Sequence, residues 1–145
     1  MKILDAYKLA AQLHAAQLDK AGRPYIEHLS RVFARTVALG GDRTQQIAAL
    51  LHDSIEDKRA LAGDLLHFGV PQEAVDLVLV LTHQAGESYE AYLGRVSLDS
   101  RALLVKRADL DDNSDPERLA KLPPEKAAKL AAKYSAARRI LAGVL

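Results

Sequence analysis

The chain contains no cysteine, which excludes disulfides, thiolate metal sites and cysteine nucleophiles. The absence of cysteine also suits a reducing compartment, so we expect a cytoplasmic protein. Aromatic residues are scarce as well: the 145 residues include two Phe and five Tyr, whereas Ala and Leu are abundant. Because Ala and Leu favour helices while aromatic residues favour strands, this composition indicates a helical protein.

Long apolar runs and a strong net charge are also missing. No apolar run approaches the ~20 residues of a membrane-spanning helix, and the first residues, MKILDAYK, lack the apolar core of a secretory signal. The formal net charge of +1 is too small to make nucleic acid the leading partner. We therefore expect no membrane and no nucleic acid as partners, and a single domain that spans residues 1–145.

Apolar residues recur every three or four positions along most of the chain, which is typical of amphipathic helices. The expected helices cover residues 3–18, 25–39, 43–57, 59–69, 70–83, 88–96, 99–113 and 125–141. The expected caps are Asp42 or Thr44, Ser88 and Asp99. The run VDLVLVL would also suit a buried strand, but no partner strand is evident, so we predict a helix there. These patterns predict an all-α bundle of roughly seven to nine helices.

Four polar side chains interrupt the stretch LLHDSIED, which otherwise reads as buried helix: His52, Asp53, Glu56 and Asp57. On a helix they share an arc of roughly 140°, apart from the apolar stripe. No Lys or Arg stands four positions away from Asp53 or Glu56 to offset the acids. Two interpretations are open, and this stretch alone favours the first, a solvated helix face. The second is a cation site, because an adjacent imidazole and carboxylate can both bind one divalent ion.

Two other segments offer further candidate ligands. His28 follows a Gly/Pro turn at the start of the second predicted helix, where a lone His is more often a surface or capping residue. Lys106, Asp109 and Asn113 share an arc of about 60° on their helix. A cation, a carboxylate and an amide on one stripe suit a surface that binds phosphate and metal. The acids of residues 109–112 also lie near a helix C-terminus, where the dipole prefers cations, and this misplacement favours a functional role.

The segments KAGRPYIEH, LLHDSIED and VKRADLDDN together resemble the HD-domain superfamily of metal-dependent phosphohydrolases. The resemblance is strongest to the alarmone, (p)ppGpp, hydrolases, which comprise the hydrolase domain of the RelA/SpoT proteins and small stand-alone enzymes. An isolated His-Asp pair is a weak motif, but this ordered set, which runs to Asn113, is specific. The resemblance implies a compact HD-domain helical bundle.

The resemblance also implies roles for individual residues. The implied metal ligands are His28, His52, Asp53 and Asp109, and the implied acidic pair beside the metal is Glu56 and Asp57. The expected substrate contacts are Lys20, Tyr25, Lys106 and Asn113; for Tyr25, packing beneath the ligand turn and stacking on a base are both open. One divalent ion is implied, with Mn²⁺ expected and Fe²⁺, Mg²⁺ or Zn²⁺ also suited to histidine and carboxylate ligands.

The expected reaction is hydrolysis of a nucleotide phosphoester or pyrophosphate, similar to that of a guanosine 3′,5′-bis(diphosphate) 3′-pyrophosphohydrolase. The metal would lower the pKa of a bound water, and Glu56, alone or with Asp57, would orient or deprotonate that water. The last predicted helix carries three regularly spaced lysines, Lys126, Lys129 and Lys133. Their spacing favours a solvated helix face, and binding of a polyphosphate is the alternative.

Three departures from the alarmone-hydrolase pattern leave the substrate open. Asp19 stands where these enzymes usually carry an Arg that helps to hold the guanine nucleotide. Lys58 replaces a common Thr, and the segment 111–112 replaces a common Leu-His. The alternatives are an HD phosphohydrolase for another nucleotide or small phosphoester, and a catalytically idle HD module that binds a nucleotide. The intact pair Glu56 and Asp57 argues against the idle module.

Overall fold

The computed structural model describes residues 1–143, and within them the regular elements are nine helices and no strand. Their bounds are α1 (Ile3–Leu13), α2 (Tyr25–Ala38), α3 (Arg43–Leu51), α4 (Ala62–His67), α5 (Gln72–Val80), α6 (Tyr89–Ser97), α7 (Ser100–Asn113), α8 (Pro116–Leu119) and α9 (Pro124–Ala142). The predicted all-α class is confirmed, and the segment VDLVLVL is helical as predicted. None of the helices in this part of the chain has both the length and the apolarity to span a membrane.

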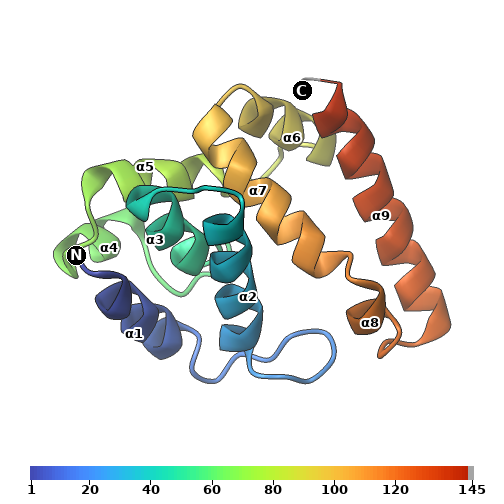
Figure 1. Cartoon of the computed structure of the whole chain (residues 1–145), viewed down its shortest axis with the longest axis horizontal. Coiled ribbons are helices and arrows are strands. Elements are labelled where there is room, and N and C mark those ends of the chain that lie inside the picture. Colours follow the sequence, from blue (N-terminus) through green and yellow to red (C-terminus); the bar gives the residue numbers. More distant parts are fainter. Residues whose placement is uncertain (144–145) are drawn as a thin grey trace.

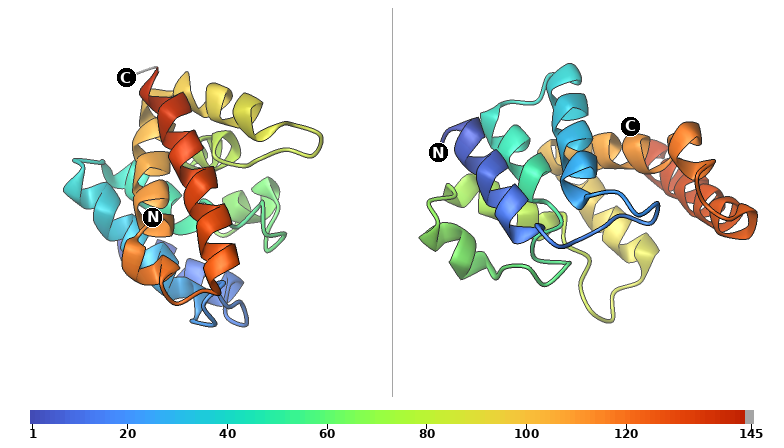
Figure 2. Two further views of the ribbon diagram at one scale, coloured as in Figure 1. Left: turned by 90° about the vertical axis from the view of Figure 1, so that its right-hand side faces the viewer. Right: turned by 90° about the horizontal axis from the view of Figure 1, so that it is seen from below.

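Helix α3 lies at the centre of the bundle and packs against α1, α2, α5 and α7 (Figure 1). Every residue from Ile47 to Leu51 is buried, so the C-terminal half of this helix is apolar on all sides. Helix α9 runs along α7 on the side of the molecule away from α1 and α4, and it also contacts α6 and α8 (Figures 1 and 2). The N-terminal end of α2, the C-terminal ends of α3 and α7, and α9 therefore surround one region.

Local capping explains where several helices begin. The side chain of Asp42 accepts the backbone N–H of Gln45 at 2.9 Å, so Asp42 rather than Thr44 caps α3. Ser88 caps α6 and Asp99 caps α7 in the same way, as predicted. These bonds occupy backbone donors that have no partner inside the helix.

Two helices end more than a turn earlier than the sequence predicted. The first ends at Leu13 instead of 18, and α3 ends at Leu51 instead of 57. At the end of α3, His52 Nδ1 bonds to the carbonyl of Ala49 at 2.7 Å and the Ser54 hydroxyl donates to the carbonyl of Leu51 at 2.6 Å. Such side-chain bonds compete with the helical ladder. Residues 52–58 therefore form tight turns, and the predicted extension of the helix to residue 57 is wrong. The four polar side chains of this stretch nevertheless face the same side, as predicted, because all four line one cavity.

Candidate metal centre

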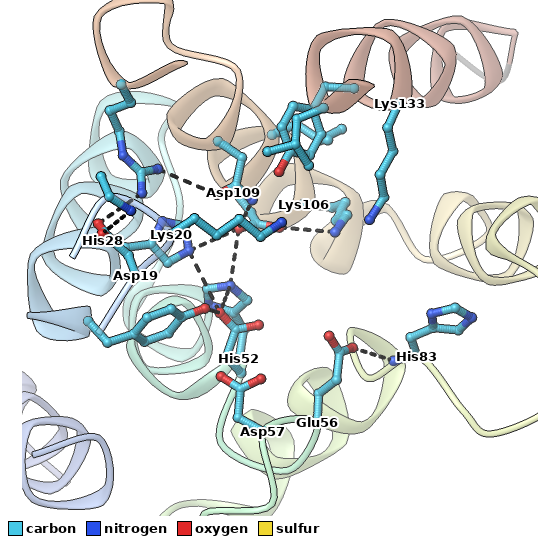
Figure 3. A pocket seen from close by; sticks show the side chains of 18 of the residues that line it. Asp19, Lys20, His28, His52, Glu56, Asp57, His83, Lys106, Asp109 and Lys133 are labelled. Carbon is cyan, nitrogen blue, oxygen red and sulfur yellow. Dashed lines mark hydrogen bonds and ion pairs between the residues drawn. The ribbon is translucent and has the colours of Figure 1, made fainter. Parts of the chain in front are cut away.

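The metal cluster, which we define as His28, His52, Asp53 and Asp109, brings together residues from three helix ends. His28 lies in the first turns of α2, His52 and Asp53 follow α3, and Asp109 lies near the end of α7 (Figure 3). Asp109 Oδ1 lies 3.2 Å from His28 Nε2 and 3.3 Å from His52 Nε2. Ligand atoms of these three residues all lie within 4.8 Å of one another.

Asp53 completes this arrangement. Its Oδ2 lies 3.1 Å from His52 Nε2 and 3.7 Å from His28 Nε2. Two imidazole nitrogens and an Asp109 oxygen thus converge, and an Asp53 oxygen lies beside both nitrogens. Nitrogen and oxygen donors without a thiolate suit Mn²⁺, Fe²⁺, Mg²⁺ or Zn²⁺. The donor set fits the divalent ion that the sequence predicted.

Neighbouring groups hold the two histidines from behind. His52 Nδ1 faces the carbonyl of Ala49 at 2.7 Å, and His28 Nδ1 faces Asp112 Oδ2 at 2.7 Å. A carbonyl or carboxylate oxygen can only accept, so each Nδ1 carries a proton. Each Nε2 is then the atom available to a metal, and in both residues Nε2 is the atom that faces the cluster.

The two carboxylates of the cluster are anchored as well. The Tyr25 hydroxyl donates to Asp53 Oδ2 at 2.5 Å. Asp109 accepts from Lys106 Nζ at 3.0 Å and from the Asn113 amide at 3.1 Å. Three predicted substrate contacts, Tyr25, Lys106 and Asn113, therefore touch the metal cluster directly. For Tyr25, the contacts are those of the packing alternative, since its ring also stacks on His14.

The electrostatics of the cluster favour a bound cation. Burial alone lowers the pKa of His28, but the carboxylates of Asp109, Asp112 and Asp53 outweigh it and raise that pKa to about 10. The pKa of His52 is also raised against the effect of burial, by Asp53 and Asp109. The carboxylates thus draw positive charge to this position. A divalent ion supplies that charge and displaces the histidine protons when it binds.

Glu56 and Asp57 stand beside the cluster on the same wall (Figure 3). Glu56 Oε1 accepts the backbone N–H of His83 at 2.8 Å, and Asp57 Oδ2 accepts from the amide of Gln17 at 2.8 Å. Burial and the nearby charge of Asp53 raise the pKa of both carboxyl groups. A raised pKa makes each carboxylate a better proton acceptor than a free one.

A cavity of about 380 Å³ opens in front of these residues. Lys20 and Lys133, which we call the lysine pair, line it and are exposed to solvent (Figure 3). Burial and the charges of Lys133 and Lys126 lower the pKa of Lys20. Among residues 1–143, neither member of the lysine pair lies within 4.0 Å of a carboxylate, in contrast to Lys106. The cavity therefore has carboxylates and histidines at one end and uncompensated positive charge elsewhere on its wall.

The first part of the chain matches the model of a known protein family. A model described as the HD domain matches residues 6–88, which is more than half of the chain. The matched segment includes His28, His52 and Asp53, together with the acids Glu56 and Asp57. The chain belongs to the HD-domain family. Asp109 lies outside the matched segment and joins the cluster through the fold.

Curated relatives of this HD domain include RelA/SpoT proteins. The bifunctional (p)ppGpp synthase/hydrolase RelA of Mycobacterium tuberculosis is 35% identical over 136 residues, which cover 87% of this chain and 18% of that protein. The guanosine-3′,5′-bis(diphosphate) 3′-pyrophosphohydrolase of Aquifex aeolicus is 32% identical over 121 residues, which cover 77% of this chain and 17% of that protein. The chain thus spans less than a fifth of the length of these relatives. The predicted resemblance to RelA/SpoT proteins is confirmed.

A solved structure shares the fold of this HD domain. It is that of a metazoan ortholog of SpoT that hydrolyses ppGpp, and it superposes with a TM-score of 0.81 at 24% sequence identity. The superposition covers 98% of this chain and 86% of that chain. The predicted HD-domain helical bundle is therefore confirmed.

Two of the departures in this HD domain have a structural explanation. Asp19 Oδ1 accepts the backbone N–H groups of Ala21 and Arg23, both at 2.9 Å, and so stabilises the turn before α2. Asp19 Oδ2 accepts from Arg118 of α8 at 3.2 Å, which holds a guanidinium against the cavity. Arg118 also donates to Asp112 Oδ2 at 2.8 Å. The altered positions Asp19 and Asp112 are thus linked through one arginine.

Three residues of this region were missing from the predicted site. Arg118 follows no motif, Gln17 lies 40 positions from the Asp57 that it contacts, and Asp112 lies 84 positions from His28. The excess of acids at the end of α7 was the one available indication of Asp112. Lys133 lines the cavity, so for this lysine of α9 the geometry fits the alternative of a phosphate grip; Lys126 and Lys129 do not line it.

Proposed function

We propose that this HD domain is a divalent-metal-dependent phosphohydrolase and that its substrate is guanosine 3′,5′-bis(diphosphate). The observation that carries the proposal is the buried convergence of His28, His52 and Asp109 at a cavity that also holds Glu56 and Asp57. The relative from Aquifex aeolicus, a 3′-pyrophosphohydrolase of this nucleotide, supports the choice of substrate. Water would cleave the 3′ phosphoester bond and yield guanosine 5′-diphosphate and pyrophosphate.

His28, His52, Asp53 and Asp109 would hold the ion, for which we propose Mn²⁺, with Fe²⁺, Mg²⁺ or Zn²⁺ as alternatives. A divalent ion at this position supplies a water of lowered pKa and polarises a phosphoryl oxygen. Tyr25, Lys106 and Asn113 orient Asp53 and Asp109 through the bonds described above. The ligands are then preorganised, so little free energy is spent on ordering them when substrate binds.

Glu56 and Asp57 would accept the proton of the attacking water. The His83 N–H fixes one oxygen of Glu56 and the Gln17 amide fixes one oxygen of Asp57, which leaves the second oxygen of each group for the water. Because the pKa of both groups is raised, each carboxylate takes a proton from water more readily than an exposed acid does.

The lysine pair would bind the phosphates of the substrate that are not cleaved. Within residues 1–143, Lys20 and Lys133 have no carboxylate partner. Burial and the repulsion from neighbouring cations lower the pKa of Lys20, and a bound polyphosphate would offset that repulsion. A nucleotide with diphosphates at both the 3′ and 5′ positions can reach the metal cluster and a separate cationic group at the same time. A nucleoside monophosphate has no second phosphate for the lysine pair.

The test is a hydrolysis screen with Mn²⁺ over guanosine 3′,5′-bis(diphosphate), GTP, nucleoside monophosphates and a generic phosphodiester. We expect pyrophosphate release from the first substrate by the wild-type protein and none by His52→Ala. Equal turnover by His52→Ala would contradict the metal-dependent mechanism.

A second candidate function keeps the metal chemistry and changes the substrate to another nucleotide or small phosphoester. Asp19 favours it, because a carboxylate replaces the arginine that the alarmone hydrolases usually carry at this position. Preferred hydrolysis of another compound in the same screen would select this candidate. Wild-type protein that binds Mn²⁺ without hydrolysing any compound would instead fit an idle binding module.

The single domain over residues 1–145 and the cytoplasmic location stay predictions.

A further inference from the structure

Asp112 is a fully buried carboxylate that receives hydrogen bonds from two helices. Its Oδ2 lies 2.7 Å from His28 Nδ1 and accepts from Arg118 Nη1 at 2.8 Å, while its Oδ1 accepts from Arg31 Nε at 2.7 Å. Arg35 Nε lies 4.0 Å from the same Oδ1. A buried carboxylate is costly unless it is paired, and here guanidinium groups from α2 and α8 offset its charge. Those arginines keep Asp112 available as an anionic acceptor.

The bond from His28 to Asp112 differs from the corresponding bond of His52. His52 Nδ1 donates to the neutral backbone carbonyl of Ala49, which follows from the end of α3 itself. His28 Nδ1 instead donates to a charged side chain that lies 84 positions away in the sequence. A carboxylate behind a ligating histidine fixes its tautomer and ring orientation and makes its other nitrogen a stronger ligand. His28 therefore depends on a residue that can be replaced without altering the backbone.

We propose that Asp112 is a positioning residue that holds His28 Nε2 toward the divalent ion. The inference rests on the metal centre of the proposed function and adds to it a residue that contacts neither substrate nor metal. Removing the charge of Asp112 would free the Nδ1 side of His28 from its fixed acceptor. The ring could then turn or carry its proton on Nε2, and either change removes a metal ligand.

The experiment compares the Mn²⁺ affinity of wild-type protein, Asp112→Asn and Asp115→Asn, measured by electron paramagnetic resonance of free Mn²⁺. Asp115→Asn is the matched control, because Asp115 pairs with Arg35 at 3.5 Å beside the same network but touches no histidine. We expect Asp112→Asn to raise the Kd for Mn²⁺ by roughly 10- to 100-fold. We expect Asp115→Asn to stay within about twofold of wild type.

A double-mutant cycle separates positioning from general destabilisation. If Asp112 acts through His28, adding Asp112→Asn to a His28→Asn protein should change the Mn²⁺ affinity by less than about twofold. An equal loss in both backgrounds, or an Asp112→Asn protein that binds Mn²⁺ as Asp115→Asn does, would overturn the inference. Circular dichroism of each metal-free variant verifies folding; if Asp112→Asn does not fold, Asp112→Ser, which also removes the charge, replaces it with the same expectation. Wild-type protein that binds no divalent ion would instead overturn the proposed metal centre itself.

Discussion

The metal cluster and the lysine pair line one cavity but differ in how the protein holds them. His28, His52 and Asp109 are buried, and each cluster residue has a hydrogen-bond partner that orients it. Lys20 and Lys133 are exposed and have long, flexible side chains, and Lys133 Nζ lies over the ring of Tyr89 at 4.7 Å from its centroid. The metal cluster is therefore the rigid end of the cavity and suits chemistry, which depends on geometry. The lysine pair is the adaptable end and suits the binding of a charged group.

The largest effect should come from removing a ligand of the rigid end. We expect His52→Ala or Asp53→Ala to lose bound Mn²⁺ and to lower kcat on the order of a thousandfold or more, because the metal contributes several kcal/mol of charge stabilisation. Metal analysis of the purified protein and a pyrophosphate-release assay measure both quantities. His67→Ala, a change at an exposed histidine of α4, is the control and should alter neither. Full activity of the Asp53→Ala protein would remove Asp53 from the cluster.

Replacing the acids should separate chemistry from metal binding. We expect Glu56→Gln to lower kcat by roughly 10²- to 10⁴-fold, as for the loss of a general base, while the Kd for Mn²⁺ remains near the wild-type value. Asp57→Asn tests the second acid in the same assay. A loss of Mn²⁺ that parallels the loss of kcat would show that these acids belong to the rigid end as ligands.

The same acids predict the pH dependence of the reaction. A base works only when deprotonated, and burial raises the pKa of Glu56 above its ordinary value of 4.5. The rate should therefore fall as pH decreases through a midpoint above 4.5, and not at the lower pH expected of an exposed Glu. A kcat profile of the Mn²⁺-saturated wild-type protein measures this limb. Persistence of the limb in both Glu56→Gln and Asp57→Asn would assign it to another group.

The fold class and the metal cluster were predictable because their patterns are local or ordered along the chain. Helical periodicity, the caps at Ser88 and Asp99, and the His-Asp pair can each be read from a few neighbouring residues. The early end of α3 at Leu51 was not predictable from periodicity, since it depends on bonds that His52 and Ser54 make with backbone carbonyls. Such bonds compete with the backbone hydrogen bonds of the helix.

Contacts between segments far apart in the sequence could not be predicted from such local patterns. The His28–Asp112 and Gln17–Asp57 bonds join positions 84 and 40 residues apart, and neither pair has a characteristic spacing. The direction of Lys133 depends on how α9 packs against α6 and α7, which its own sequence does not specify. Local patterns therefore found the residues of the metal cluster but not most of the groups that orient them.

At the adaptable end, smaller effects on binding are expected. We expect Lys20→Ala or Lys133→Ala to raise KM for guanosine 3′,5′-bis(diphosphate) roughly tenfold with little change in kcat, because each lysine would contribute one charge-assisted contact to phosphate. The difference from wild type should shrink as salt is added. Lys129→Ala, on the same helix but outside the cavity lining, is the matched control. A fall in kcat without a rise in KM would place the lysine pair with the chemistry.

The smallest effect should come from Asp19→Asn, which tests whether the two ends are independent. The amide oxygen can still accept the N–H groups of Ala21 and Arg23, so the turn before α2 should persist, while Arg118 loses one of its two charged partners. Since Asp112 still binds Arg118, we expect a change of about twofold in KM and none in the Kd for Mn²⁺. Mn²⁺ titration and steady-state kinetics of this variant measure both. Mn²⁺ binding that weakened as much as in Asp112→Asn would mean that Arg118 couples Asp19 to the metal cluster. The metal cluster and the residues around the lysine pair would then form a single network.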